Sequence, residues 1–488
     1  MARSDGGERP RPEIPRFDRR AFDGTQGFTR LGDGSLGGKA QGLAAVRDVL
    51  ASRLDPREFP GLTVAIPDLL VLATDVFDAF MAQNDLWPVA RGDGSDEEIA
   101  HAFQRGRLPV EYVGDLRALI AQTRVPLAVR SSSLLEDAMF EPFAGVYATK
   151  MIPNNQPETD ARFQRLVEAI KFVYASTFFR GARAYRRATR APDAEEKMAV
   201  VVQEVVGRRF GERFYPHVAG VIRSWNFYPT GAARPEEGVV DLALGLGKTI
   251  VDGGRAWTYS PAHPAAAPPF ASAAARLKQT QTRFWAVNMG RPPAFDPIRE
   301  TEYLVEAGLS EAEYDGALDW LVSTYDAESD RLVLGAGRPG PRVVDFAPLL
   351  QLDELPLNAL VRRLLPACEE AVGQKVEIEF ALSIDPRGEE PARFGFLQVR
   401  PMVVSQAEVD VADEELGSEA ALVASEQVMG NGLVETIRDV VYVRPEAFEA
   451  AATRRIAGEL EELNRPLAAD GRPYLLLGFG RWGSSDPW

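Results

Sequence analysis

The amino-acid sequence predicts an α+β fold, because segments with strand patterns and segments with helix patterns are mixed along its 488 residues. Runs rich in apolar and β-branched residues indicate strands. An amphipathic stretch such as 160–179 indicates a helix. A chain of this length can form two or three domains with ample cores. The main predicted strands are 125–129, 198–206, 218–223, 376–382 and 394–401.

The first segment with a chemical pattern is 32–46, a glycine-rich turn that runs into a predicted helix. Such a turn presents backbone N–H groups and the positive end of the helix dipole, and Lys39 adds a positive charge. These features suit a phosphate group. A plain loop-to-helix turn has the same pattern, so this segment alone does not separate the two interpretations.

The next two segments have similar ambiguity. Residues 125–149 begin with a buried strand that ends at Arg130 and three serines, a pattern that suits phosphate oxygens but also a structural turn. The β-branched strand 198–206 is interrupted by Gln203 and Glu204. It is interpreted as a core strand whose exit contacts a base, and an ordinary sheet-core strand is the alternative.

Residues 376–382 and 394–401 are predicted to form a β-hairpin, because a polar, turn-rich segment separates two alternating strands. Side chains two positions apart on a strand share a face. Ile378 and Phe380 therefore point away from the polar face of the first strand. The chain is expected to turn between residues 388 and 389.

This turn places Glu379 opposite Gln398 and Glu377 opposite Arg400 on one face of the sheet. Two carboxylates, an amide and a guanidinium in such an arrangement suit a divalent cation beside a polyphosphate. A solvated sheet face is the alternative, because alternating strands with polar outer residues are common.

Taken in order, these segments resemble the nucleotide-binding domain of the phosphoenolpyruvate synthase and pyruvate phosphate dikinase family, also found in rifampicin phosphotransferases and glucan water dikinases. The resemblance implies an ATP-grasp-like fold that binds Mg–ATP between two lobes. The matching stretches span roughly residues 31–403 and read LGGKAQGL, VRSSSLLED followed by FAGVYAT, MAVVVQEV, VAGVIRS, LGLGKTIVDGG, VEIEFAL and LQVRP.

The resemblance also implies roles for individual residues of the first lobe. Lys39 and Arg130 are expected to bind the triphosphate of ATP. Gly145 and Thr149 are expected to line the nucleotide, and Gln203 to lie at the adenine.

In the second lobe, the resemblance implies that Glu379, Gln398 and Arg400 complete the metal and phosphate site. Glu379 and Gln398 are the expected Mg²⁺ ligands. Arg130, Glu379 and Arg400 are the residues expected to take part in catalysis.

The sequence departs from the family pattern at Ala40, where glycine is common, at Lys248, where an acidic residue is common, and at Glu377, where aspartate is usual. Lys248 also makes LGLGKT look like the end of a P-loop. That motif needs a glycine five positions before Gly247, and Leu242 stands there, so a P-loop is not expected.

Complete members of the family pass phosphate through a histidine on a separate domain, and no such motif is visible. His101, His217 and His263 lie in other contexts and are interpreted as surface or strand-edge histidines. Three explanations stay open: the chain is a piece of a longer protein, the histidine is carried by another chain, or an acceptor is phosphorylated directly.

The expected organisation is a flexible arm at 1–20, a first lobe at 21–235, a second lobe at 236–405 and an α/β extension at 406–488 that looks truncated. Within the second lobe, residues 303–325 are predicted to be helical. The extension is predicted as a strand, a helix and a strand.

Composition narrows the cellular setting. A net charge of −16 argues against general nucleic-acid binding, which usually needs a basic surface. The single cysteine, Cys368, fits a reducing compartment. Neither a signal peptide nor an apolar run of about 20 residues is seen, so no membrane partner is expected and the cytoplasm is the expected location.

Two functions of different class follow. One is an ATP-dependent phosphotransferase of the dikinase type, whose acceptor histidine belongs to a phosphocarrier domain on a further segment or another chain. The other is a non-catalytic module that binds ATP for regulation or interaction.

Overall fold

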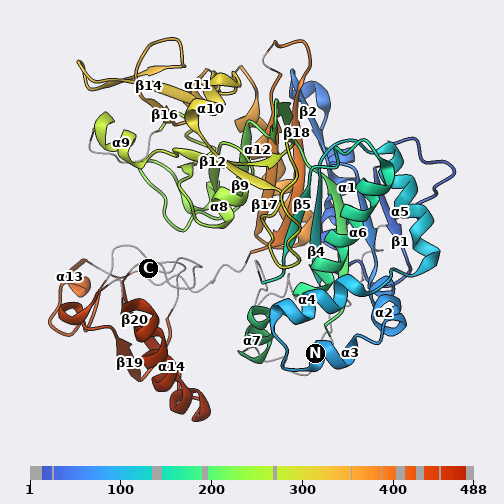
Figure 1. Ribbon diagram of the computed structural model, residues 1–488. Coiled ribbons are helices and arrows are strands. Elements are labelled where there is room, and N and C mark those ends of the chain that lie inside the picture. The colour runs from blue at the N-terminus through green and yellow to red at the C-terminus, as the bar shows by residue number, and fades with distance from the viewer. Residues whose placement is uncertain are drawn as a thin grey trace, which may run out of the picture. The chain divides into compact units, whose positions relative to one another are not determined.

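The computed structural model (Figure 1) divides into two compact units, Met1–Val403 and Val404–Trp488. Helices and strands are mixed in the first unit, and the predicted α+β fold is confirmed. The structure describes residues 14–24, 27–133, 146–188, 196–266, 272–352, 354–385, 387–402, 411, 413–424, 433–449 and 452–479.

A five-stranded sheet forms one layer of the first unit. Its order is β1 (Phe28–Leu31), β3 (Leu69–Leu72), β6 (Met198–Glu204), β4 (Leu127–Ser133) and β5 (Thr149–Ile152). Val200 and Val202 of β6 share a core with α2 (Thr74–Gln83), α4 (Asp96–Arg105), α5 (Val110–Gln122) and α6 (Thr159–Ser176). Because side chains alternate along a strand, Ala199, Val201 and Gln203 face the other side of the sheet.

A six-stranded sheet carries the hairpin. Its order is β11 (Trp257–Tyr259), β10 (Val239–Ala243), β9 (Val218–Arg223), β17 (Val376–Ser383), β18 (Ala392–Pro401) and β2 (Leu62–Ala65). Ile378 and Phe380 are buried in a core that includes α12 (Leu357–Val372). Helix α1 (Gly37–Arg53) contacts α12 and β18 and also β4 of the five-stranded sheet, so it lies where the two sheets meet.

The predicted register of the hairpin is confirmed at the two polar pairs of the site. Glu377 pairs with Arg400 and Glu379 pairs with Gln398, as the turn position predicts. The register then shifts between Glu379 and Phe380, which is a β-bulge or similar irregularity. The bulge changes the pairing nearer the turn and leaves the polar pairs in place.

The strand at 218–223 exists, but it does not join the sheet of the first predicted lobe (21–235). As β9 it pairs with β10 on one side and with β17 on the other. Strand β2, still earlier in the chain, pairs with β18. The six-stranded sheet therefore contains β2 and β9, two strands from the segment predicted as the first lobe, because strand pairing joins segments that are far apart in sequence.

A further correction concerns 303–325, which is not one helix. It forms β13 (Leu304–Gly308), α10 (Leu309–Tyr314) and β14 (Val322–Asp326). Strand β13 pairs with β12 (Arg283–Asn288) in a sheet of order β13-β12-β8-β7, with β8 at Arg213–Tyr215 and β7 at Arg208–Phe210. Strand β14 lies between β15 (Arg331–Leu334) and β16 (Arg342–Val344). Gly316, with φ of +70°, separates α10 from β14.

The remaining α-helices in the described part of the first unit are short. They are α3 (Trp87–Arg91), α7 (Arg180–Ala188), α8 (Lys248–Val251), α9 (Ala273–Gln279) and α11 (Ala347–Gln351).

The second unit is small. After α13 (Asp413–Leu416), strand β19 (Asp439–Tyr442), helix α14 (Thr453–Ala469) and strand β20 (Tyr474–Leu477) follow, and the two strands pair in parallel. The predicted strand–helix–strand order is confirmed. In the part of the chain that the structure describes, no helix combines the length and apolar character needed to span a membrane.

Candidate functional site

Arg130 lies at the centre of a polar cluster that joins the two large sheets. From β4 its side chain reaches the hairpin, where Nη2 donates to Glu379 Oε2 at 2.9 Å and to Gln398 Oε1 at 2.7 Å. Nη1 donates to the backbone oxygen of Leu397 at 3.1 Å. The side chain of Arg130 is only 14% exposed. These charge-assisted hydrogen bonds hold its guanidinium in place.

Gln203 belongs to the same cluster and comes from β6. Its Oε1 accepts a hydrogen bond from Arg130 Nη1 at 3.3 Å, and the residue is 2% exposed. Its Nε2 is buried and has no hydrogen-bond partner among the described residues. A buried donor without an acceptor costs about 1–3 kcal/mol, so this N–H is suited to an acceptor on a ligand.

Lys39 is brought to β4 by the glycine turn that begins α1. Gly37 has φ of +71°, and a Cβ there would lie 1.6 Å from the backbone oxygen of Ser132. Only glycine permits this approach. Lys39 Nζ then donates to the backbone oxygen of Ser131 at 3.0 Å and to its Oγ at 3.2 Å. The predicted glycine turn and the serine-rich strand end are thus one local structure.

A row of polar side chains crosses the six-stranded sheet next to the polar cluster around Arg130. Glu377 Oε1 accepts from Arg400 Nε at 2.8 Å, and Glu377 Oε2 accepts from Arg223 Nε at 2.7 Å. The three residues lie opposite one another on β18, β17 and β9. Each oxygen of this carboxylate is therefore held by an arginine on a neighbouring strand.

Asp241 of β10 and Thr258 of β11 extend this row. Arg223 Nη1 donates to Asp241 Oδ2 at 2.6 Å, and Asp241 Oδ1 accepts a hydrogen bond from the hydroxyl of Thr258 at 2.5 Å. Arg223 and Asp241 were missed in the sequence. The sequence offered only a weak signal for them, since each is the single polar residue in a short apolar strand.

Of the two residues predicted to line the nucleotide, the structure describes Thr149 but not Gly145. Thr149 pairs with Arg130 across β5 and β4, and its backbone N–H donates to Glu300 Oε1 at 3.0 Å. Thr149 is therefore next to the cluster, while residues 134–145, which include Gly145, lie outside the described part of the chain.

Lys248 lies outside this cluster. It is the first residue of α8, its Nζ lies 3.0 Å from Asp252 Oδ2, and it lies 5.9 Å from the centroid of the Trp285 ring. Its described contacts are those of a helix-terminal ion pair.

The three histidines have no part in the cluster that the described residues form. His101 is exposed on α4, and His263 lies 3.4 Å from Glu237. His217 is 2% exposed, and its Nδ1 accepts from the backbone N–H of Ile384 at 3.1 Å. Burial, together with the nearby Arg208, lowers the pKa of His217 to about 4.

The buried His217 predicts a loss of stability in acid. Between about pH 6.5 and 4 the unfolded chain protonates this histidine while the folded chain does not, so the free energy of unfolding falls as the pH falls, by up to about 3 kcal/mol. His217→Asn keeps an acceptor for Ile384 and does not titrate. Urea unfolding at about pH 7 and pH 4.5 should show a smaller acid loss in this variant than in the wild type. His101→Asn is the control, and equal losses in all three proteins would contradict the prediction.

The described residues contain no group of three or more histidine, cysteine or acidic side chains that could by itself hold a metal ion. Glu379 and Gln398 supply two oxygen donors side by side on the hairpin. Mg²⁺ usually binds through one or two carboxylates together with water and substrate phosphates. The residues fit a Mg²⁺ ion that arrives with a polyphosphate, and they do not form a separate metal cage.

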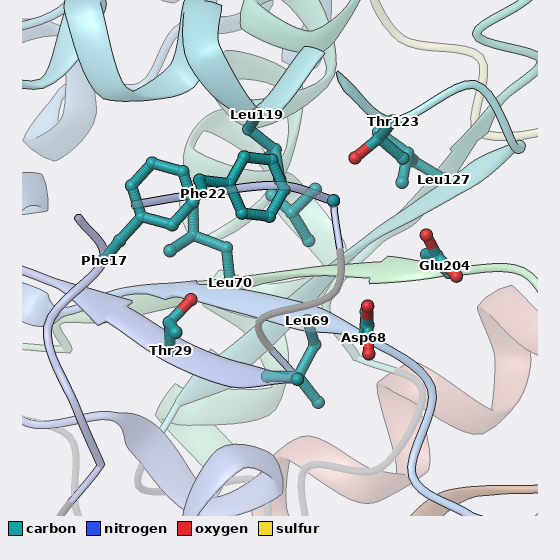
Figure 2. A pocket seen from close by; sticks show the side chains of 13 residues that line it. Phe17, Phe22, Thr29, Asp68, Leu69, Leu70, Leu119, Thr123, Leu127 and Glu204 are labelled. Atoms are coloured by element: carbon teal, nitrogen blue, oxygen red, sulfur yellow. The ribbon is translucent and has the colours of Figure 1, made fainter. Parts of the chain in front are cut away.

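A small cavity lies at a different place, on the helix-covered side of the five-stranded sheet (Figure 2). Its volume is about 20 Å³, which is room for one water molecule. Phe17, Phe22 and Leu119 line one part of it, and Asp68 and Glu204 lie at one end. Burial raises the pKa of both carboxyl groups. Glu204 follows Gln203 on β6 and points to the opposite face, so this cavity is separate from the polar cluster.

Comparison with known proteins shows the family of this chain. Residues 33–420 match the family model described as the pyruvate phosphate dikinase, AMP/ATP-binding domain. The chain belongs to this family. All the residues of the polar cluster fall within the matched range, and the resemblance stated from the motifs is confirmed.

A curated relative shares part of this pyruvate phosphate dikinase-type domain. The chain is 27% identical over 205 residues to a rifampicin phosphotransferase of Streptomyces sviceus. The match covers 39% of this chain and 22% of the relative, so the chain spans about a fifth of that protein's length.

Proposed function

We propose that this domain binds Mg–ATP between the five-stranded sheet and the hairpin and transfers phosphate from it to an acceptor. The observation that carries the proposal is the position of Arg130, a half-buried cation that contacts Gln203 from one sheet and Glu379 and Gln398 from the other. Its four Nη–H groups are held by protein acceptors, and phosphate oxygens that replace some of these acceptors would receive charge-assisted hydrogen bonds from a cation already placed between the two sheets.

The proposed roles follow from charge and position. Lys39, Arg130 and Arg400 bind the phosphates, and Thr149 lines the nucleotide. For Gly145, which lies outside the described residues, the same role rests on the family resemblance alone. Mg²⁺, when bound with ATP at Glu379 and Gln398, would neutralise phosphate charge and polarise the reacting phosphoryl group.

An apolar cluster beyond the end of β6 suits the adenine base. Val205 and Met151 pack against the buried side chains of Phe214, Leu246, Val287 and Met289. The cluster begins two residues after Gln203, whose buried Nε2 supplies a hydrogen-bond donor. An apolar wall with a few polar groups is the usual character of a nucleotide-base pocket.

The proposed reaction is of the dikinase type, with the acceptor histidine on a phosphocarrier domain outside this chain, in the cytoplasm. The imidazole nitrogen attacks the β-phosphorus of ATP, the bond to the AMP oxygen breaks, and the diphosphoryl group passes to histidine. The second candidate, a module that binds ATP without turnover, is favoured by the positions of the three histidines, none of which lies in the described cluster.

Product analysis separates the two candidates. The chain is incubated with labelled Mg–ATP, with and without candidate histidine-bearing domains, and AMP is resolved from ADP. We expect slow hydrolysis by the chain alone, because positioning of a nucleophile accounts for about 7–11 kcal/mol of a barrier. AMP that rises only with a partner supports the proposal, and Glu379→Gln should abolish this rise.

Other products would change the conclusion. ADP as the main product would indicate direct transfer of the γ-phosphoryl group. Tight ATP binding without either product, with every partner domain, would leave the non-catalytic module.

A further inference from the structure

The carboxylate of Glu377 is held from both sides by arginines, and only one of them lies beside the polar cluster around Arg130. Arg400 is two residues from Gln398 on β18 and holds Oε1, while Arg223 on β9 holds Oε2. The side chain of Glu377 is 11% exposed, compared with 27% for Arg400 and 30% for Arg223. The carboxylate is therefore the buried centre of this triad.

We infer that Arg223 is a positioning residue, which fixes Glu377 so that Glu377 in turn holds the Arg400 guanidinium at the phosphate site. The inference rests on the proposed binding of ATP, and it assigns a role to a residue on a strand outside the hairpin.

Geometry indicates why two arginines are needed. A carboxylate held at one oxygen alone can rotate about its side-chain bonds, and Arg400 would follow it. Arg223 fixes the second oxygen from the neighbouring strand, where it stands directly opposite Glu377. A guanidinium donates through several N–H groups in a rigid plane, so it can hold two acceptors at once.

Arg223 is itself fixed at its far end. Its Nη1 donates to Asp241, whose other oxygen is held by Thr258, so both ends of the guanidinium have partners. The row thus runs from β11 to β18 with alternating charge at Asp241, Arg223, Glu377 and Arg400.

Charge balance gives the second reason. The row contains two arginines and two carboxylates, and it is neutral as a whole. Without Arg223, one positive charge would remain for two carboxylates beside a site that is proposed to bind an anion. The unbalanced negative charge of the row would repel the negative phosphates of ATP, and this repulsion is stronger in a half-buried setting than in water. ATP should therefore bind less tightly.

The test compares nucleotides that differ in phosphate number. Arg223→Gln should lower the affinity for Mg–ATP by about tenfold and change the affinity for AMP by less than about twofold, since AMP lacks the β- and γ-phosphates. Arg223→Lys keeps the charge and should recover part of the loss. Arg283→Gln is the matched control, because Arg283 also pairs with a carboxylate on a neighbouring strand, Glu306 at 2.9 Å, but is exposed.

A double-variant cycle tests the route through Glu377. Arg223→Gln and Glu377→Gln together should weaken ATP binding no more than either change alone, because both interrupt the same chain of contacts. Additive losses would overturn the inference. Equal losses for ATP and AMP would also overturn it, because they would indicate a general effect on the sheet.

One measurement is independent of nucleotide binding. In the wild type the Arg400 Nε–H bonded to Glu377 should exchange slowly with solvent, as observed by NMR with labelled arginine. In Arg223→Gln this exchange should become at least tenfold faster. If the wild type binds no ATP, the proposed function fails, and this exchange rate still decides the role of Arg223: an unchanged rate would overturn it.

Discussion

Replacing Arg130 with methionine is expected to lower the affinity for Mg–ATP by between about tenfold and hundredfold. A hydrogen bond between charged groups contributes about 1.5–3 kcal/mol, and about 1.4 kcal/mol is a factor of ten in affinity. The change also removes the cation that hydrogen-bonds Glu379, so this carboxylate would face the phosphates without compensation. Isothermal titration calorimetry with Mg–ATP measures the loss.

Two further variants define what Arg130 contributes. Arg130→Lys keeps the charge but cannot reproduce a planar group with four acceptors, so its affinity should lie between those of the wild type and the methionine variant. Arg393→Met is the control, because Arg393 is 50% exposed and its nearest carboxylate, Glu204, is 3.8 Å away. If Arg130→Met stays folded and binds ATP as tightly as Arg393→Met, the phosphate site has been assigned to the wrong place.

Glu302→Gln is expected to cost about 3–5 kcal/mol of unfolding free energy, because it leaves a buried lysine without its counter-charge. Lys150 Nζ lies 2.5 Å from Glu302 Oε2, and the two side chains are 4% and 1% exposed. Lys150 Nζ also donates to the backbone oxygen of Arg299 at 2.7 Å and lies 4.7 Å from the centroid of the Phe172 ring. Burial lowers the pKa of Lys150, and Glu302 opposes this effect.

The pair also connects two parts of the fold. Lys150 is on β5 of the five-stranded sheet, and Glu302 lies just before β13 of another sheet. Urea or guanidinium unfolding of the variant measures the cost. Glu306→Gln is the matched control, since its pair with Arg283 is 39% and 60% exposed and should contribute less than about 1 kcal/mol.

A compensating variant separates charge burial from packing. Lys150→Met combined with Glu302→Leu removes both charges and should recover much of the lost stability. Equal unfolding free energies for Glu302→Gln and Glu306→Gln would show that the buried pair contributes no more to stability than the exposed pair, which would contradict the prediction.

The sequence by itself determined the hairpin and its polar face. Alternation of side chains assigned Glu377 and Glu379 to one face, and the turn position gave their partners, because both are properties of a short contiguous segment. It also identified the glycine turn at Lys39 and the strand ending at Arg130. Helix 160–179 and the strands at 198–206 and 218–223 were likewise found within a few residues of their observed ends.

Only the tertiary structure decided which strands are neighbours. Strand 218–223 was predicted correctly as a strand, but it pairs with β10 and with the hairpin strand β17, not with the other strands predicted at 125–129 and 198–206. Residues 303–325 were predicted as a helix, although two parts of them pair as strands. Arg223 and Asp241 became visible beside Glu377 for the same reason. A local pattern records which side chains share a face, whereas strand pairing is fixed by the burial of apolar surface between segments far apart in the chain.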